Sequence, residues 1–176
     1  MIFIPGPLIA ALTFPGVIMH EVAHRFMCDL LHVPVYGANY FSIGSTRAGY
    51  VSHQKTDNVI HVLLISFAPL FINSFFCMLF TLPYSSTIHI AGEGINNFAN
   101  GFLWWVGMSM GINAFPSNQD TDNALSAAEE NGGSFIIWLL CSLMKVLNFL
   151  SRIWIDFAYA YGVSLILPRL IFGSHN

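Results

Sequence analysis

The sequence predicts an α-helical integral membrane protein with about four to five transmembrane helices. Hydrophobic residues make up 55% of its 176 residues, whereas charged residues make up only 9%. The mean hydropathy of +0.63 lies outside the usual range for a soluble globular domain. The apolar residues also gather into tracts of about 20 residues or more, which is the length that a helix needs to cross a bilayer.

The chain length corresponds to one membrane-embedded domain, 1–176, with a core of about 8–123 and a C-terminal helical segment of about 134–172. Six basic and nine acidic residues give a net charge of −3, so the chain has no basic footprint for nucleic acid. Its three cysteines form no CxxC pair, which favours small buried hydrophobes over a disulfide framework.

Four apolar tracts define the expected helices in chain order. The first span runs from about Leu8 to Leu31, the second is Val59–Leu82, and the third is Phe98–Phe115. The last tract, Ser134–Phe172, is longer than one span requires and contains three charged residues. It is either two tightly connected helices or one span followed by an interfacial amphipathic stretch.

The connections between these tracts differ in character. In Val33–Asp57, short aromatic and β-branched pieces alternate with glycines, which predicts a small hairpin or strand segment after the first helix. Pro83–Asn97 is expected to be a polar loop, and Pro116–Gly133 a polar, acidic loop.

The distribution of basic residues predicts the orientation in the membrane. Arg25, Arg47 and Lys55 lie in or beside the first connection, whereas the second connection has no Lys or Arg. The positive-inside rule then places the first connection in the cytoplasm. Because two further spans follow, the acidic Pro116–Gly133 segment returns to that same cytoplasmic side.

The first tract contains the sequence His20-Glu21-Val22-Ala23-His24 near its C-terminal end. On a helix, residues four apart lie about 40° from each other on one face, so both imidazoles can reach a single zinc ion. Glu21 can reach a water on that ion, as the general base of an HExxH hydrolase does. Burying these groups in an apolar helix is costly, which itself favours a functional role.

A catalytic zinc usually has three protein ligands and one open position. The residues leave the third ligand open among four acids that follow Asn113 and a proline turn: Asp120, Asp122, Glu129 and Glu130. An ordinary loop or capping role is favoured for the last three of these. Asp57 stays open as well, although a solvated acid at a helix N-terminus explains it well.

HEVAH at 20–24, followed by Asn113-x-x-Pro116 and then an aspartate, resembles the site-2 protease family of intramembrane zinc metalloproteases. The resemblance covers roughly residues 8–123. In that family, an Asn-Pro-Asp-Gly region supplies an aspartate as the third zinc ligand. Pro116-Ser-x-x-Asp120 resembles the form in compact, divergent members, so the resemblance implies Asp120, with Asp122 as the alternative. No glycine follows either aspartate, which departs from the family pattern.

The resemblance implies one zinc ion per chain, held by His20, His24 and Asp120, and hydrolysis of peptide bonds in membrane-spanning substrates. Glu21 would be the general base, and Asn113 would hydrogen-bond the substrate or its oxyanion; a helix-end cap explains Asn113 equally well. The active site would face the cytoplasmic side. Substrate choice would come from the loops or from a regulatory membrane partner.

Two alternatives remain open. One is an HtpX-type membrane zinc protease, in which Glu129 or Glu130 is the third ligand. The other is a non-catalytic zinc-binding membrane scaffold.

Overall fold

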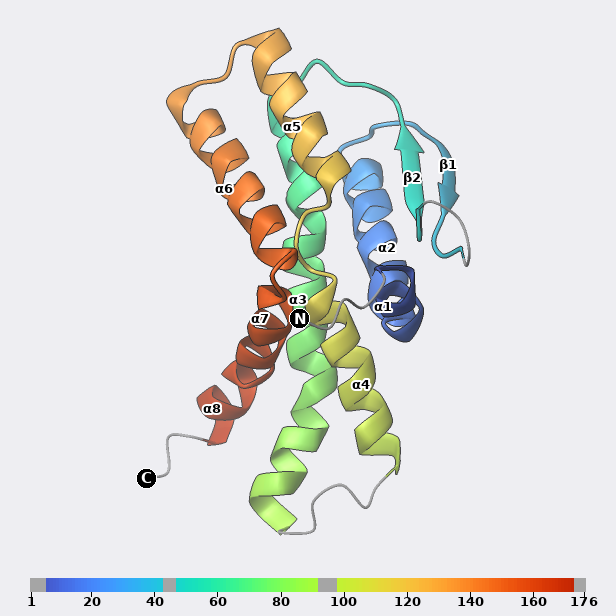
Figure 1. Cartoon of the computed structure of the whole chain (residues 1–176), viewed down its shortest axis with the longest axis vertical. Coiled ribbons are helices and arrows are strands. Elements are labelled where there is room, and N and C mark those ends of the chain that lie inside the picture. Colours follow the sequence, from blue (N-terminus) through green and yellow to red (C-terminus); the bar gives the residue numbers. More distant parts are fainter. Residues whose placement is uncertain (1–5, 43–46, 92–97, 173–176) are drawn as a thin grey trace.

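One long helix, α3 (Val59–Ala91), forms the axis of the molecule, and the other helices pack around it (Figure 1). The structure is a computed structural model that describes residues 6–42, 47–91 and 98–172. The fold is mostly helical, with a small two-stranded antiparallel sheet after the first long helix.

The first predicted span is broken into two helices, α1 (Gly6–Leu12) and α2 (Phe14–Leu30). The break falls at Thr13, and α2 has a proline in its first turn. Proline has no N–H to donate and favours the start of a helix over its interior, which explains why one continuous helix does not form. The motif residues 20–24 therefore lie near the middle of α2.

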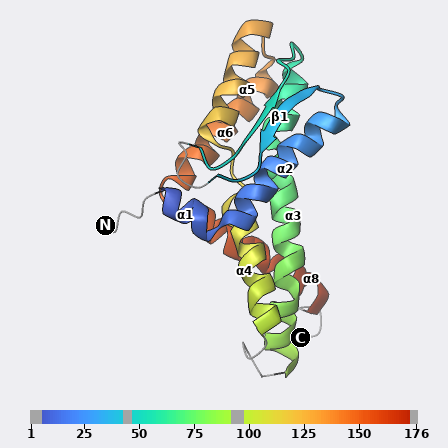
Figure 2. The same cartoon turned by 90° about the vertical axis from the view of Figure 1, so that its right-hand side faces the viewer.

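The predicted hairpin is confirmed. Strands β1 (Val35–Asn39) and β2 (Tyr50–His53) pair antiparallel, with Val35 opposite His53 and a register shift between Val35 and Gly37. Figure 2 shows the hairpin beside α2, which places its strands close to the motif helix.

The second predicted span is confirmed as a helix and is longer than expected. The polar loop expected from Pro83 is wrong for residues 83–91, because α3 continues to Ala91 with Pro83 inside it. An internal proline removes one backbone hydrogen bond and kinks a helix without necessarily ending it. The rest of that expected loop, 92–97, lies outside the described residues. Helix α4 (Phe98–Ile112) then returns alongside α3.

The acidic segment expected to be a loop folds as helix α5 (Asn118–Asn131). Ser117 begins it with a capping box, in which its hydroxyl accepts from the Asp120 N–H and the Asp120 carboxylate accepts from the Ser117 N–H. Its alanines are buried against α3 and α6, in a core cluster that also contains Met144. The alternation of acids and alanines is therefore an amphipathic helix pattern.

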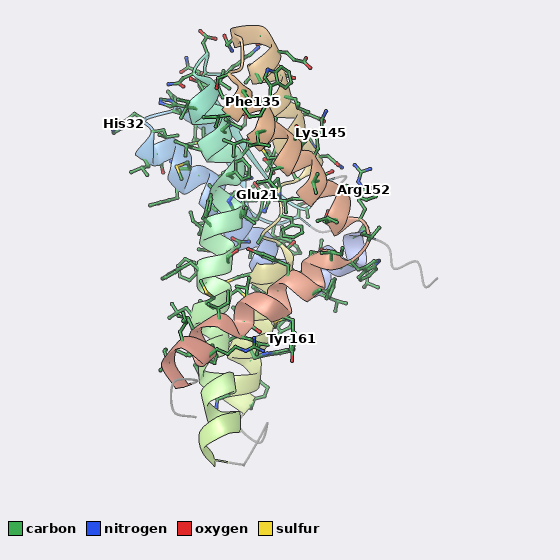
Figure 3. All side chains as sticks on the ribbon, turned by 90° about the vertical axis from the view of Figure 1, so that its left-hand side faces the viewer. Glu21, His32, Phe135, Lys145, Arg152 and Tyr161 are labelled. Carbon is green, nitrogen blue, oxygen red and sulfur yellow. The ribbon has the colours of Figure 1, made fainter. Side chains whose placement is uncertain are left out.

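The C-terminal tract is divided into α6 (Phe135–Ser151), α7 (Ile155–Ser164) and α8 (Ile166–Phe172). Figure 3 shows α6 from Phe135 to the break near Arg152. The helices on either side of this break are bent by 101°. Trp154 lies in the left-handed region with φ +67°, which ends the α6 geometry. Of the two expectations for this tract, the structure contains separate, connected helices.

Among the described helices, Val59–Pro83 of α3 has the length and apolar composition to cross a membrane. The bent pair Phe135–Ser151 and Ile155–Ile171 would be a second candidate if it counts as one span. Helices α2 and α4 have 17 and 15 residues, fewer than the roughly 20 that span a bilayer unaided. The expectation of four to five transmembrane helices therefore stays a prediction.

Candidate metal centre

The two motif histidines lie on one face of α2 and turn their rings toward each other. Their ring centroids are 4.8 Å apart, and their Nε2 atoms are 3.1 Å apart. His24 is buried and His20 is nearly so. The spacing of four residues on a helix thus brings both nitrogens to one point, as the sequence predicts.

Asp120, at the start of α5, completes this group. Its Oδ1 lies 3.2 Å from His24 Nε2, and its Oδ2 lies 3.6 Å from His20 Nε2. Among the described residues, His20, His24 and Asp120 form the one group of three or more such side chains close enough to hold a metal ion. The structure therefore brings together the three ligands that the family resemblance implies.

The other candidate ligands lie elsewhere. Asp57, Asp122 and Glu129 are exposed, and none belongs to the metal-binding group. Glu130 is also exposed, and its carboxylate lies 2.5 Å from the Lys55 ammonium in a surface ion pair. The hydrogen bond that the ammonium donates to this carboxylate raises the pKa of Lys55.

Backbone carbonyls fix the orientation of both imidazoles. His20 Nδ1 lies 2.8 Å from the Asn113 carbonyl oxygen, and His24 Nδ1 lies 2.9 Å from that of Ile65. Because a carbonyl only accepts, each Nδ1 must carry the proton, so in the neutral ring each Nε2 has a lone pair. A second hydrogen bond of this kind commonly orients metal-binding histidines.

With both rings neutral, the Nε2 atoms of His20 and His24 and an Asp120 carboxylate oxygen would repel one another at these distances. Two Nε2 lone pairs and a carboxylate oxygen need positive charge among them, either as extra protons or as a metal ion. Two nitrogens bound to a tetrahedral zinc at its usual bond length lie about 3.3 Å apart, close to the 3.1 Å separation between the rings. The donor set and its spacing fit a divalent metal such as zinc.

The surroundings of Asp120 favour its ionised form. Burial alone would raise the pKa of Asp120, but the charge on His24 and hydrogen bonds with both imidazoles outweigh it and hold the pKa well below its usual range. The same carboxylate accepts from the Ser117 N–H at 2.8 Å. Asp120 is thus both the helix cap and a carboxylate of the metal group.

Glu21 is buried beside the histidines and is covered by the chain that leads into β2. A Cβ added at Gly49 would lie only 2.7 Å from Glu21 Cγ, so the hairpin passes very close to this side chain. Figure 3 places Glu21 among the helices near the middle of the molecule.

Two hollows meet at the metal-binding group. One, of about 490 Å³, is lined by β2 residues 51–53 and by both histidines and Asp120. The other, of about 800 Å³, extends toward α6 and α7 and contains Asn148 and Asp156. Both are lined by His20 and Glu21, so the motif borders both hollows, which are together called the cleft below.

The Asn113 side-chain amide is hydrogen-bonded to neighbouring helices, and Asn113 lines the larger hollow together with His20 and Glu21, so its expected contact with substrate stays a prediction. Its Nδ2 donates to Thr13 Oγ1 at 3.0 Å and to the Ser109 carbonyl at 2.9 Å, which ties α4 to the start of α2. Its backbone carbonyl is the atom that holds His20. The sequence indicates Asn113 as a candidate through its side chain. It contains no signal that the backbone carbonyls of Asn113 and Ile65 orient the two histidines.

Comparison of the chain with models of known protein families, with curated proteins and with solved structures found no match. A functional assignment therefore depends on the sequence motif and on the geometry of this site.

Proposed function

We propose that the protein is an intramembrane zinc metalloprotease similar to the site-2 proteases, with zinc held by His20, His24 and Asp120. The observation that carries this proposal is the convergence of two carbonyl-oriented Nε2 atoms and a buried carboxylate beside Glu21. With both rings neutral, two Nε2 lone pairs and a carboxylate oxygen would face one another, and a bound cation would satisfy all three acceptors at once.

Bound zinc would supply Lewis acidity, polarising the scissile carbonyl and lowering the pKa of a water. Glu21 removes the proton from that water and transfers it to the leaving amine. Glu21 is largely buried but lines both hollows, so it can meet a water that enters through them. Asn113 has a positioning role in this scheme, since its carbonyl orients His20.

The exposed surface of α3 supports a membrane location. Its outward side chains are large and apolar and recur at intervals of four or seven residues, which places them on one face: Ile60, Leu64, Phe71, Phe75 and Leu79. Ile65, which orients His24, comes six residues after Val59, or about 9 Å along the helix axis. The metal site would then lie below the membrane surface, within reach of water through the cleft.

The proposed topology has α2, α3 and α4 as a three-helix membrane core, with α6 to α8 adding one or two further crossings. The hairpin and α5 lie near the start of α3, and the end of α3 and the start of α4 lie at the opposite end of the molecule (Figure 1). We place the hairpin end in the cytoplasm because Arg47 and Lys55 lie there.

Strand β2 supports binding of an extended substrate segment. Its residues 51–53 line the cleft, and β1 pairs with only one of its edges. A transmembrane or membrane-anchored protein must unwind locally before hydrolysis, and addition of the unwound segment to a strand edge is a common recognition mode.

The proposal is tested by purifying the full chain and measuring zinc binding and cleavage of a transmembrane substrate together. Glu21→Gln is expected to bind zinc as the wild type does and to lose cleavage by about 10²–10⁴-fold. Persistent cleavage by this variant would exclude the proposed mechanism, and zinc binding without any wild-type cleavage would favour the scaffold alternative.

The third ligand is tested by substitution of neighbouring acids. Asp120→Asn is expected to weaken zinc binding strongly, whereas Asp122→Asn, two residues away on the exposed face of α5, is the matched control. Loss of zinc in Glu129→Gln or Glu130→Gln, with Asp120→Asn unaffected, would favour the HtpX-type alternative.

A further inference from the structure

The turn between α4 and α5, residues 113–117, carries two parts of the metal centre. At its start, the Asn113 carbonyl accepts from His20 Nδ1. At its end, Ser117 caps the helix that presents Asp120. A displacement of this turn would therefore move one histidine and the carboxylate relative to His24.

Two asparagine side chains from other helices hold this turn. On α3, Asn73 Nδ2 donates to the Asn113 carbonyl at 3.0 Å. On α6, Asn148 Nδ2 donates to the Pro116 carbonyl at 3.1 Å. Carbonyls after the last turn of a helix have no partner within that helix, so these amides satisfy acceptors that the backbone alone leaves open.

Burying the Asn73 amide costs folding free energy, so a purely structural role explains this residue poorly. Its side chain is fully buried in an apolar helix, and its Oδ1 has no hydrogen-bond partner among the described residues. A leucine at this position would fill the space without an unsatisfied polar atom. Its value lies in its Nδ2, which also donates to the Gly16 carbonyl at 3.3 Å and so joins α2 to the turn.

The orientation of the Asn148 amide is fixed by Arg152. The Arg152 guanidinium donates to Asn148 Oδ1 at 3.2 Å and to Asn118 Oδ1, in the first turn of α5, at 2.8 Å. With Oδ1 occupied by a donor, Nδ2 is directed toward the Pro116 carbonyl. The C-terminal tract thus hydrogen-bonds both the turn, through Asn148, and the start of α5, through Arg152.

We propose that Asn73 and Asn148 are positioning residues that clamp the 113–117 turn and so hold His20 and Asp120 in metal-binding register. This inference rests on the proposed metal centre and assigns to α6 a role in that centre. Neither side chain belongs to the metal-binding group; both act through backbone carbonyls.

The test measures metal binding by the purified full-length chain, with Zn²⁺ affinity from chelator competition and the visible d–d spectrum of bound Co²⁺. Asn73→Leu and Asn148→Leu are each expected to weaken Zn²⁺ binding by about tenfold or more, as is usual when groups that orient metal ligands are removed. The Co²⁺ bands are expected to shift or lose intensity, because the ligands no longer hold one geometry.

Matched controls separate positioning from stability. Thr81→Val removes a buried hydroxyl from α3 that donates to the Cys77 carbonyl in the same helix. Ser142→Ala removes an equivalent contact, to the Trp138 carbonyl, from α6. Both controls are expected to keep the wild-type Zn²⁺ affinity and Co²⁺ spectrum, even where they lower the melting temperature.

Asn148→Asp keeps an acceptor for Arg152 but loses the donor to Pro116, so it tests the clamp with little change of shape. We expect it to lose as much affinity as Asn148→Leu. Wild-type affinity and an unchanged Co²⁺ spectrum in Asn148→Asp would overturn the clamp. A wild-type chain that binds neither ion would instead overturn the proposed metal centre, so the two failures are distinguishable.

Discussion

Gly16 lies one helical turn before His20, at a point where the backbones of α2 and α4 approach closely. A Cβ at this position would be 1.9 Å from the Ser109 carbonyl oxygen, well inside van der Waals contact. The obstacle is backbone, so no side-chain rotation relieves it. Gly16→Ala would have to push the two helices apart by about 1.5 Å or more.

The cost follows from the contacts made here. Gly16 N–H donates to Ser109 Oγ at 2.6 Å, and that hydroxyl donates to the Thr13 carbonyl at 3.0 Å. Overpacking costs about 1–3 kcal/mol, and each lost hydrogen bond adds about 1 kcal/mol. Alanine's better helix propensity returns about 1 kcal/mol. Gly16→Ala should therefore lower the unfolding free energy by about 2–4 kcal/mol.

The same displacement separates His20 from the Asn113 carbonyl that orients it, so Zn²⁺ affinity should fall as well. The assay is denaturant unfolding in mild detergent, together with chelator competition. Gly101→Ala on α4 is the matched control, because a Cβ there meets nothing within 4 Å. It should be neutral or stabilising by up to about 1 kcal/mol. Wild-type stability and Zn²⁺ affinity in Gly16→Ala would refute this reasoning.

Three further predictions concern the cap, the hairpin and the thiols. Ser117→Ala should cost about 1 kcal/mol in unfolding free energy, because it removes the hydroxyl that caps α5, and should weaken Zn²⁺ binding by loosening Asp120. Gly49→Ala should reduce substrate cleavage about tenfold at full zinc occupancy, because its Cβ would displace Glu21. A thiol reagent should label no cysteine in the folded protein and all three after denaturation, because each is buried: Cys28, Cys77 and Cys141.

Each of these has a result that would contradict it. A Ser117→Ala chain as stable as the wild type would mean that the capping box contributes nothing. Undiminished cleavage by Gly49→Ala would show that the hairpin does not constrain Glu21. Rapid labelling of a native cysteine would show that its helix is not packed as described.

The helices and hairpin of the core were predictable because their signals are local. Long apolar tracts and glycine-separated aromatic pieces reflect the chain's own composition, and the structure has helices and a hairpin at those places. The break at Thr13 and the continuation of α3 past Pro83 each depend on a different proline, one in the first turn of α2 and one inside α3. Whether a proline ends a helix or is tolerated within it depends on the packing around it. Helix α5 does not follow from composition, because a polar, acidic segment favours a loop, although Ser117 and Asp120 have capping-box spacing.

The metal centre was predictable only in part, for a similar reason. The i, i+4 spacing of His20 and His24 guarantees a shared face on any helix. Asp120 as the third ligand follows only from the family resemblance, because spacing along the chain does not show which acidic side chain lies next to the histidines of α2. The carbonyls that orient the rings have no side-chain signature, and neither do the contacts of Asn73 and Asn148 with the 113–117 turn.

The most direct test of the central claim is X-ray absorption at the zinc edge of the purified full-length chain. We expect one zinc per chain with two imidazole nitrogens and the remaining ligands oxygen, at about 2.0–2.2 Å. A chain that retains no zinc, or a zinc shell that contains cysteine sulfur, would contradict a metal centre formed by His20, His24 and Asp120.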